Sequence, residues 1–342
     1  MATYRASSLR KFGRMEWSGS LIGFGSLTLG NMGKVTPPDV VSALVRHALD
    51  SGVRVFDTAP MYGHGLSEYR LGAELRDRDR QSYRLITKVG RTLHPAAPGS
   101  FDTAPWINTP PMRVEFDYSY DGVMRQVEDS LQRMGTDHFD VLLVHDIDRW
   151  THGADQPEHF RAALDGAFKA LLSLRDQKAV GAIGAGVNEV DVCLAIADAV
   201  DIDCLLIAGT YCLLDQQADV ELLPLCETRG IAVVNGRIFG SGIMATGARG
   251  DARFDYAPAP TEVLARVQAF EKVCRRYDVP LGAVAIQFAA AHPTISTVCI
   301  GARNVSQQSE AFGWLEQHIP ADLWAELKAN DLLYDAAPVP VP

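Results

Sequence analysis

Short apolar segments recur at regular intervals along the chain. Eight runs rich in Val, Ile and Leu lie at residues 21–25, 53–57, 84–88, 139–145, 180–184, 204–208, 231–234 and 297–301. A continuous apolar run of this length is typical of a strand that is buried on both faces, as in a parallel sheet. The pattern therefore predicts eight parallel strands.

Between these runs, apolar residues recur with the spacing of an amphipathic helix. The predicted helices are 39–51, 120–134, 160–175, 189–199, 217–229 and 262–277. Three of them are followed by a glycine shortly before the next strand, namely Gly52, Gly135 and Gly230. A glycine just past the last turn is a common helix stop, so these positions support the predicted boundaries.

Strands and helices alternate from one end of the chain to the other without a linker. This order predicts one (β/α)8 TIM barrel domain over residues 1–342, with an open doubly wound sheet as the alternative. The alternative usually carries G-x-G-x-x-G after its first strand, and here residues 23–25 lack the third glycine. Two Gly-, Ala- and Pro-rich segments, at about 90–118 and 236–260, are predicted to be site loops that follow strands.

Composition narrows the classes of function. The chain has 47% hydrophobic and 22% charged residues and a net charge of −10, which disfavours contact with nucleic acid. No apolar run approaches the ~20 residues that span a bilayer, so we expect a cytoplasmic protein without a membrane partner. The six cysteines form no C-x-x-C pair, which predicts buried free thiols. The oligomeric state stays open.

Polar side chains stand at the ends of three predicted strands. Asp57, Lys88 and His145 each end a strand, and Tyr62 follows Asp57 by five residues. In a parallel barrel these ends share one face, so the four side chains are expected to converge. Together they suit proton transfer at a carbonyl or carbinol oxygen. We expect Lys88 to lower the pKa of Tyr62, Asp57 to hold Lys88, and His145 to orient the oxygen.

Two long motifs resemble those of a known family. Residues 56–68 (FDTAPMYGHGLSE) resemble the first signature of the aldo-keto reductases, and residues 129–140 (DSLQRMGTDHFD) resemble the second. Residues 300–304 (IGARN) are similar to the family's cofactor segment. The resemblance implies a barrel of the aldo-keto reductase type, NAD or NADP as cofactor, and a catalytic tetrad of Asp57, Tyr62, Lys88 and His145.

The resemblance also implies where the cofactor lies. The pyrophosphate is expected at a loop with Gly240 and Gly242, where small residues let backbone N–H groups approach anionic oxygens. A guanidinium suits a 2′-phosphate but also stacks on adenine, so the choice between NAD and NADP stays open. The expected contacts of the adenosine end are Gly301, Arg303, Gln307 and Glu310.

Three positions depart from the usual family pattern. Residues 183–188 (IGAGVN) lack the Ser-Asn pair that usually holds the nicotinamide carboxamide, and Asn188 is the nearest candidate. The usual Gln of the next strand is replaced by Ala208 or Gly209. The aromatic that stacks on the nicotinamide ring is replaced by Gly236. These departures affect the nicotinamide end of the site and leave the tetrad intact.

Shorter motifs are similar to one branch of the family. Residues 116–122 (FDYSYDG), 145–148 (HDID) and 205–211 (LLIAGTY) resemble the D-threo-aldose 1-dehydrogenases and pyridoxal 4-dehydrogenases. Members of this branch oxidise a cyclic hemiacetal to a lactone. The resemblance implies oxidation at C1 of an aldose such as L-fucose or D-arabinose, with pyridoxal as the alternative substrate.

The substrate pocket is expected to be lined by Trp106, Asp146 and Tyr211. Asp146 and Asp148 follow His145 directly, yet we expect no metal there, because the family uses none. Two other functions stay open: a broad aldehyde and ketone reductase, and a non-catalytic cofactor-binding regulatory subunit. The presence of all four tetrad residues favours an enzyme.

Overall fold

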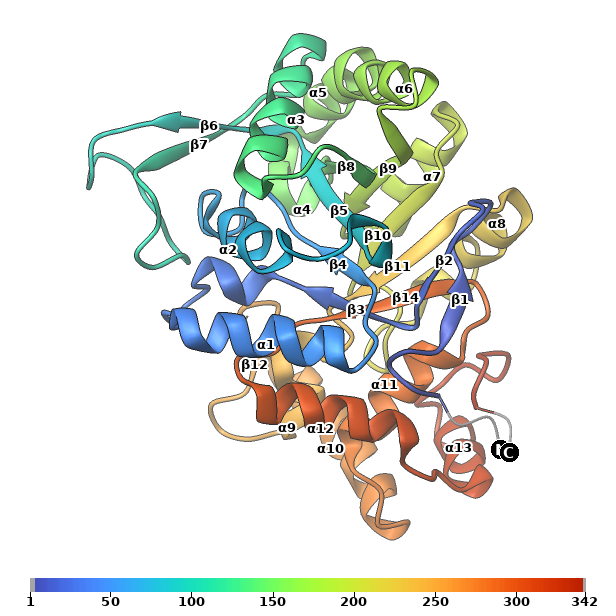
Figure 1. The fold of residues 1–342 in the computed structure, drawn as a ribbon. Coiled ribbons are helices and arrows are strands. Elements are labelled where there is room, and N and C mark those ends of the chain that lie inside the picture. Colours follow the sequence, from blue (N-terminus) through green and yellow to red (C-terminus); the bar gives the residue numbers. More distant parts are fainter. Residues whose placement is uncertain (1–3, 341–342) are drawn as a thin grey trace.

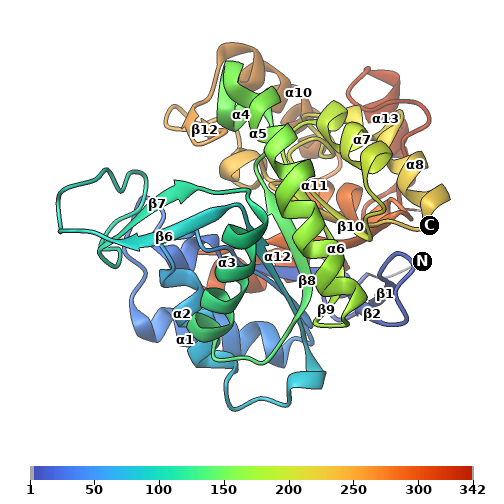
Figure 2. The same ribbon diagram turned by 90° about the horizontal axis from the view of Figure 1, so that it is seen from above.

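The computed structural model describes residues 4–340, so residues 1–3 and 341–342 of the predicted domain lie outside it. Eight parallel strands form a closed barrel in the order β10-β11-β14-β3-β4-β5-β8-β9, surrounded by helices (Figures 1 and 2). The strands are β3 (Ile22–Gly25), β4 (Val55–Asp57), β5 (Arg84–Val89), β8 (Phe139–His145), β9 (Val180–Val187), β10 (Cys204–Ala208), β11 (Ala232–Gly236) and β14 (Ile295–Ile300).

All eight predicted strands are confirmed, with shifts of one to three residues at half of their ends. Closure of the barrel rules out the open doubly wound sheet. The strands read as apolar runs because both of their faces are covered. A small cluster that includes Val55, Ile86 and Leu143 fills the barrel interior, and a larger cluster lies between the strands and the helices.

The helices that cover the barrel include the six predicted ones, in part interrupted. The main helices are α1 (Pro38–Asp50), α2 (Leu66–Leu75), α3 (Tyr120–Met134), α5 (Gln156–Ala162), α6 (Phe168–Asp176), α7 (Val190–Ala199), α8 (Leu222–Arg229), α10 (Thr261–Arg276), α11 (Leu281–Ala291), α12 (Val305–Glu316) and α13 (Ala321–Ala329). Gly135 and Gly230 adopt left-handed conformations at helix ends, as predicted. The pattern did not predict α11, because its residues are nearly all apolar and give no periodic contrast.

A hairpin at the N-terminal end of the chain covers the bottom of the barrel. It consists of β1 (Leu9–Lys11) and β2 (Ser18–Ser20). Phe12 between them is fully buried in the interior cluster and stacks on Trp17, with ring centroids 4.3 Å apart. The barrel interior is therefore filled from below. The hairpin was not predicted from the sequence.

Two further hairpins lie at the carboxyl ends of the strands, within the predicted site loops. The first, β6 (Arg91–Pro95) with β7 (Met112–Phe116), projects away from the barrel (Figure 2). The segment between its strands returns to the barrel, where Trp106 pairs with Met32. The second is short and consists of β12 (Arg253–Phe254) and β13 (Ala257–Pro258).

The six cysteines are free thiols, as predicted, and five of them are buried. Cys299 is partly exposed and lies on β14 near the mouth of the barrel. Within residues 4–340, no helix has the length and apolar character needed to cross a membrane.

Candidate active site

Three of the predicted tetrad residues end neighbouring strands and point into the barrel. Side chains alternate between the two faces of a strand, so a residue two positions after an interior residue also faces inward. Asp57 follows interior Val55 on β4, and Lys88 follows interior Ile86 on β5. His145 likewise ends β8, which pairs with β5. Because β4, β5 and β8 are adjacent, the three side chains meet; we call them the charged wall.

Lys88 forms the centre of the charged wall. Its ammonium donates hydrogen bonds to both carboxylate oxygens of Asp57, at 2.7 and 2.9 Å, and to the carbonyl of Thr58 at 2.8 Å. Both charged side chains are almost completely buried. Burial raises the pKa of Asp57, and the Lys88 charge acts in the opposite direction. With three acceptors the ammonium is fully engaged, which fixes its position.

Tyr62 lies over this pair in the turn that follows β4. Lys88 Nζ is 4.8 Å from the centre of the Tyr62 ring. The His145 ring is edge-on to it, with centroids 6.1 Å apart. The turn is held where Gly63, at φ +66°, meets the backbone of Gly30; a Cβ on Gly63 would lie 2.4 Å from the Gly30 oxygen. Sequence prediction and structure thus bring all four residues together.

The expected effect of Lys88 on Tyr62 is not what the structure gives. Burial, followed by the negative charge of Asp57, raises the pKa of Tyr62 well above its ordinary value. The Lys88 charge is largely neutralised by the carboxylate it contacts. Tyr62 is therefore a neutral phenol at neutral pH.

His145 has two close partners that the sequence did not single out as a pair. Arg91 Nη1 lies 2.9 Å from His145 Nδ1, and Asp146 Oδ2 lies 3.3 Å from His145 Nε2. Burial, followed by the positive charges of Arg91 and Lys88, lowers the pKa of His145 well below its ordinary value. The imidazole is therefore neutral and acts as a hydrogen-bond donor or acceptor, not as an acid.

The two signature motifs are joined by a buried ion pair. Glu68, from the first motif, is fully buried; it accepts hydrogen bonds from Arg133 of the second motif at 2.6 Å and from Thr87 at 2.7 Å. Thr87 directly precedes Lys88 on β5. This pair therefore fixes α2 and α3 against the strand that carries the central lysine.

The three predicted substrate residues have different surroundings. Trp106 packs beside Tyr62, with ring centroids 6.0 Å apart, and is 4% exposed. Asp146 adjoins His145 and forms an ion pair with Arg91 at 2.8 Å. Tyr211 is fully buried, stacks on Phe288 of α11 and lies in the packing layer, so its predicted role in the pocket is wrong. Tyr211 lies three residues beyond the end of β10, so strand alternation does not predict which side it would occupy.

Small residues form the opposite side of the barrel mouth. Alternation along β9, β10 and β11 directs Gly186, Ala208 and Gly236 inward; we call them the small-residue wall. A Cβ on Gly186 would lie 3.6 Å from Lys88 Cε, and one on Gly236 would lie 3.6 Å from the nearest atom, so neither glycine is required by packing. Glycine inside a strand often marks a place where a ligand approaches the backbone closely.

Asn188 ends up between the walls. It follows β9, and its amide donates to Asp148 at 2.9 Å and approaches Asp146 at 3.4 Å. It is half-buried. Asn188 is therefore one contact away from His145, through Asp146, and its role toward the carboxamide stays a prediction.

The other predicted cofactor residues follow β11 and β14. Gly240 and Gly242 adopt φ values of +52° and +106° in a tight turn before α9 (Ile243–Thr246), which favours glycine. Arg303 donates to the Met32 carbonyl at 3.1 Å, and the Gln307 side chain accepts from the Arg303 N–H at 3.0 Å. Gly301, Arg303, Gln307 and Glu310 are all exposed at the start of α12 or just before it.

Arg237 is a residue of the mouth that sequence reasoning missed. It follows β11, donates to the Ala208 carbonyl at 2.5 Å, pairs with Asp255 of the second hairpin at 3.2 Å and lies over the Trp150 ring. Gly209, at φ +85°, leaves the space that the guanidinium occupies. Arg237 thus joins three loops at the small-residue side.

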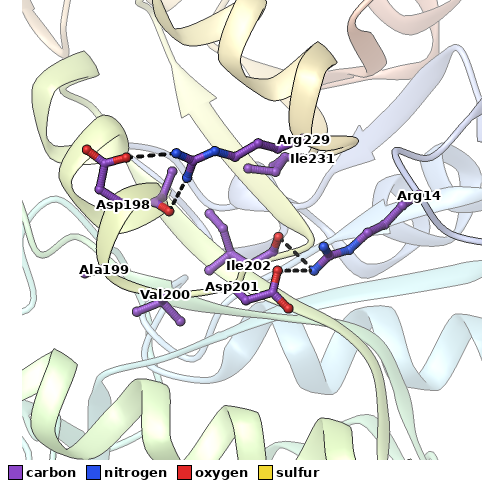
Figure 3. Close-up of a pocket in the computed structure, with 9 residues that line it drawn as sticks. Arg14, Asp198, Ala199, Val200, Asp201, Ile202, Arg229 and Ile231 are labelled. Carbon is purple, nitrogen blue, oxygen red and sulfur yellow. Dashed lines mark hydrogen bonds and ion pairs between the residues drawn. The ribbon is translucent and has the colours of Figure 1, made fainter.

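A separate hollow lies at the other end of the barrel. It has a volume of about 240 Å³ and is lined by α7, α8 and the segment before β10 (Figure 3). Arg14 pairs there with Asp201 at 2.8 Å, and Arg229 pairs with Asp198 at 3.1 Å. The first pair attaches the N-terminal hairpin to the bottom of the barrel and the second joins α8 to α7, so the hollow belongs to the scaffold.

The chain forms a closed parallel barrel with a buried Asp–Lys pair, a tyrosine and a histidine at the carboxyl ends of its strands. This combination of fold and site is typical of barrel-type oxidoreductases. Residues 21–331 match the Aldo/keto reductase family, and the chain belongs to this family. Aldo-keto reductases use nicotinamide cofactors, which fits the space beside Lys88.

Two relatives support the family assignment, and one solved structure shares the fold. It is 40% identical to pyridoxal 4-dehydrogenase of Microbacterium luteolum, over 96% of this chain and 99% of the relative. It is 35% identical to D-threo-aldose 1-dehydrogenase of a Pseudomonas species, over 91% and 94%. The holo form of aldo-keto reductase AKR11C1 from Bacillus halodurans shares the fold, with a TM-score of 0.72, 22% identity and coverage of 97% and 98%. The branch that the short motifs indicated is confirmed.

Proposed function

We propose that this enzyme oxidises a cyclic hemiacetal that carries a neighbouring hydroxyl group to its lactone, with NAD⁺ or NADP⁺ as hydride acceptor. The first candidate is C1 of an aldose such as L-fucose or D-arabinose. The observation that carries the proposal is the Asp146 carboxylate, 3.3 Å from His145 Nε2. This carboxylate is a hydrogen-bond acceptor next to the histidine that would contact the reacting oxygen. A second substrate hydroxyl would be recognised there.

The tetrad has distinct roles in this reaction. Gly186, Ala208 and Gly236 would border a bound nicotinamide ring, which would supply the hydride acceptor. The hemiacetal C–H bond would break with its electron pair passing to that acceptor, the O–H proton would pass to the phenolate form of Tyr62, and a C=O bond would form. His145 would donate a hydrogen bond to that oxygen and orient it, while Asp57 holds Lys88 beneath the Tyr62 ring.

Asp146 retains free acceptor sites for this role. A carboxylate offers about four lone-pair positions, and the described contacts come from Arg91, His145 and Asn188. Its backbone has φ +50°, a strained value for a residue other than glycine. Strain that is held by surrounding contacts is typical of residues whose side chain must point in a set direction.

Pyridoxal in its hemiacetal form is the second candidate. The 40% identity to a pyridoxal 4-dehydrogenase supports it. Its phenolic hydroxyl would reach the same carboxylate, and Trp106 beside Tyr62 offers an aromatic surface for a flat ring. The choice of cofactor belongs to the same experiment, because Arg303 suits either dinucleotide.

The test is initial-rate formation of reduced nicotinamide with L-fucose, D-arabinose, L-galactose, pyridoxal and simple alcohols, each with both cofactors. We expect turnover on one sugar group or on pyridoxal and little on simple alcohols. Comparable rates on simple alcohols and aldehydes would favour the broad reductase. No turnover on any compound of the panel, with intact cofactor binding, would favour the regulatory subunit.

Asp146→Asn sharpens the test. We expect it to lower kcat/KM for D-arabinose about 10- to 100-fold, the usual value of a hydrogen bond to a charged group, and to leave the rate on the 2-deoxy sugar nearly unchanged. An equal loss on both sugars would contradict the role of Asp146 in recognising the neighbouring hydroxyl.

A further inference from the structure

Arg91 is a buried cation beside the tetrad. It begins β6, three residues after Lys88, and its side chain turns back toward the barrel mouth. It is 5% exposed. One arm of its guanidinium meets His145 Nδ1 at 2.9 Å, the other donates to Asp146 Oδ2 at 2.8 Å, and the Phe116 ring lies 4.8 Å from its centre. Each arm therefore contacts a residue of the candidate site.

The contact with His145 determines where the imidazole carries its hydrogen. A guanidinium has only N–H donors and no acceptor. His145 Nδ1 must therefore accept, and a neutral imidazole then carries its hydrogen on Nε2. That nitrogen is the one next to Asp146 Oδ2, at 3.3 Å. Orientation is also fixed by Tyr118, whose hydroxyl contacts the carbonyl oxygen of His145 at 2.9 Å.

We propose that Arg91 is a positioning residue that fixes His145 as an Nε2–H donor and holds Asp146 beside it as an acceptor. The inference rests on the proposed function, because donor and acceptor would serve the reacting oxygen and the neighbouring hydroxyl of one substrate. Arg91 itself touches neither oxygen. It acts through His145 and Asp146, which the two arms of its planar guanidinium contact.

The charges around His145 favour this state over a wide pH range. The groups that face it are Arg91 from β6, Lys88 from β5 with its partner Asp57 from β4, Tyr62 from the turn after β4, Tyr118 from the segment before α3, and Asp146 from its own loop. Burial and the two cations lower the pKa of His145, whereas Asp146 favours its protonation. With Arg91 in place, His145 stays neutral.

Removal of the guanidinium should change both the position of the hydrogen on the imidazole and the charge state of His145. In Arg91→Met, the hydrogen is free to occupy Nδ1, and Asp146, without its cation, would favour imidazolium. We expect kcat/KM to fall about 10- to 100-fold, as for other residues that orient a ligand or catalytic histidine. The loss should grow below neutral pH, as a new acid limb that the wild type lacks. Arg91→Lys keeps the positive charge but lacks the planar pair of N–H donors. Its pH profile should therefore lack the acid limb, while its activity should recover only in part.

The decisive measurement is ¹⁵N NMR of histidine-labelled, substrate-free protein, with His145 assigned by comparison with His145→Gln. We expect the neutral Nε2–H pattern in the wild type and loss of that pattern in Arg91→Met. Arg80→Met is the matched control, because Arg80 also pairs with a buried aspartate, Asp140 at 2.7 Å, but lies at the bottom of the barrel. It should change neither the His145 pattern nor the pH profile.

The outcomes separate this inference from the proposed function. A wild-type His145 that is protonated on Nδ1, or doubly protonated near pH 7, would overturn the role of Arg91 whatever the substrate. So would an Arg91→Met protein that loses activity while the His145 pattern stays unchanged. Failure of the substrate panel with the Nε2–H pattern present would instead count against the hemiacetal reaction alone.

Discussion

The charged wall and the small-residue wall face each other across the barrel mouth and are built in opposite ways. On β4, β5 and β8, each functional side chain has close polar partners, as in the 2.7 Å contact between Lys88 and Asp57. On β9 and β11, Gly186 and Gly236 leave space that a Cβ could enter without a clash. The charged wall fixes the positions of its side chains, whereas the small-residue wall leaves space.

The difference has an energetic side. A glycine inside a strand costs about 0.5–1 kcal/mol relative to alanine. Neither Gly186 nor Gly236 is among the glycines with positive φ, so backbone conformation does not require them. A bound ring that occupies the space would offset this cost. The small-residue wall is therefore consistent with the nicotinamide site proposed above.

The largest expected effect is on the charged wall. Tyr62→Phe removes the group that exchanges the proton and leaves the ring in place. We expect kcat to fall about 10²- to 10⁴-fold, the usual contribution of a general acid or base, while cofactor binding is preserved. The measurement is single-turnover kinetics together with cofactor titration by fluorescence.

Tyr211→Phe is the matched control for that substitution. Among the described residues, no group forms a hydrogen bond with the Tyr211 hydroxyl, and the ring packs on Phe288 away from the mouth. Activity and stability should be nearly unchanged. A loss of activity like that of Tyr62→Phe would show that Tyr211 contacts the substrate after all.

The next effect is on pH dependence. Oxidation requires Tyr62 as phenolate, and its raised pKa means that the phenolate fraction is small at neutral pH. The rate of the chemical step should therefore rise about tenfold per pH unit between pH 7 and 9. Reduction needs the phenol and should be nearly flat over that range. Stopped-flow rates in both directions test this, and a flat oxidative profile would exclude Tyr62 as the base.

The smallest expected effect distinguishes space for a ligand from space for packing. Gly186→Ala should leave the free energy of unfolding unchanged or raise it by up to about 1 kcal/mol, while the KM for the cofactor rises. Gly184→Ala, two residues earlier on the same strand, is the control. Its Cβ would lie 1.7 Å from the Cys204 oxygen, so it should clearly destabilise the protein. Denaturant unfolding and cofactor titration of both variants provide the comparison. Equal destabilisation would show that both glycines serve packing.

The tetrad could be predicted from the sequence because three of its members end apolar strands, and the period of two in a strand fixes the face of each. The same reasoning failed for Tyr211, which lies beyond the end of β10, where alternation no longer applies. Helix α11 was missed because it is apolar on all sides. The N-terminal hairpin was missed because β1 and β2 are only three residues each.

Local pattern and motif were enough to predict the eight barrel strands, the barrel, the family and the four residues of the tetrad. The groups that surround these four residues depend on packing between distant parts of the chain. Lys88 is neutralised by Asp57, so burial prevails and the pKa of Tyr62 is raised. Arg91 reaches His145 from another strand, 54 residues away in the chain. Electrostatic effects depend on distance and burial, which no local pattern contains.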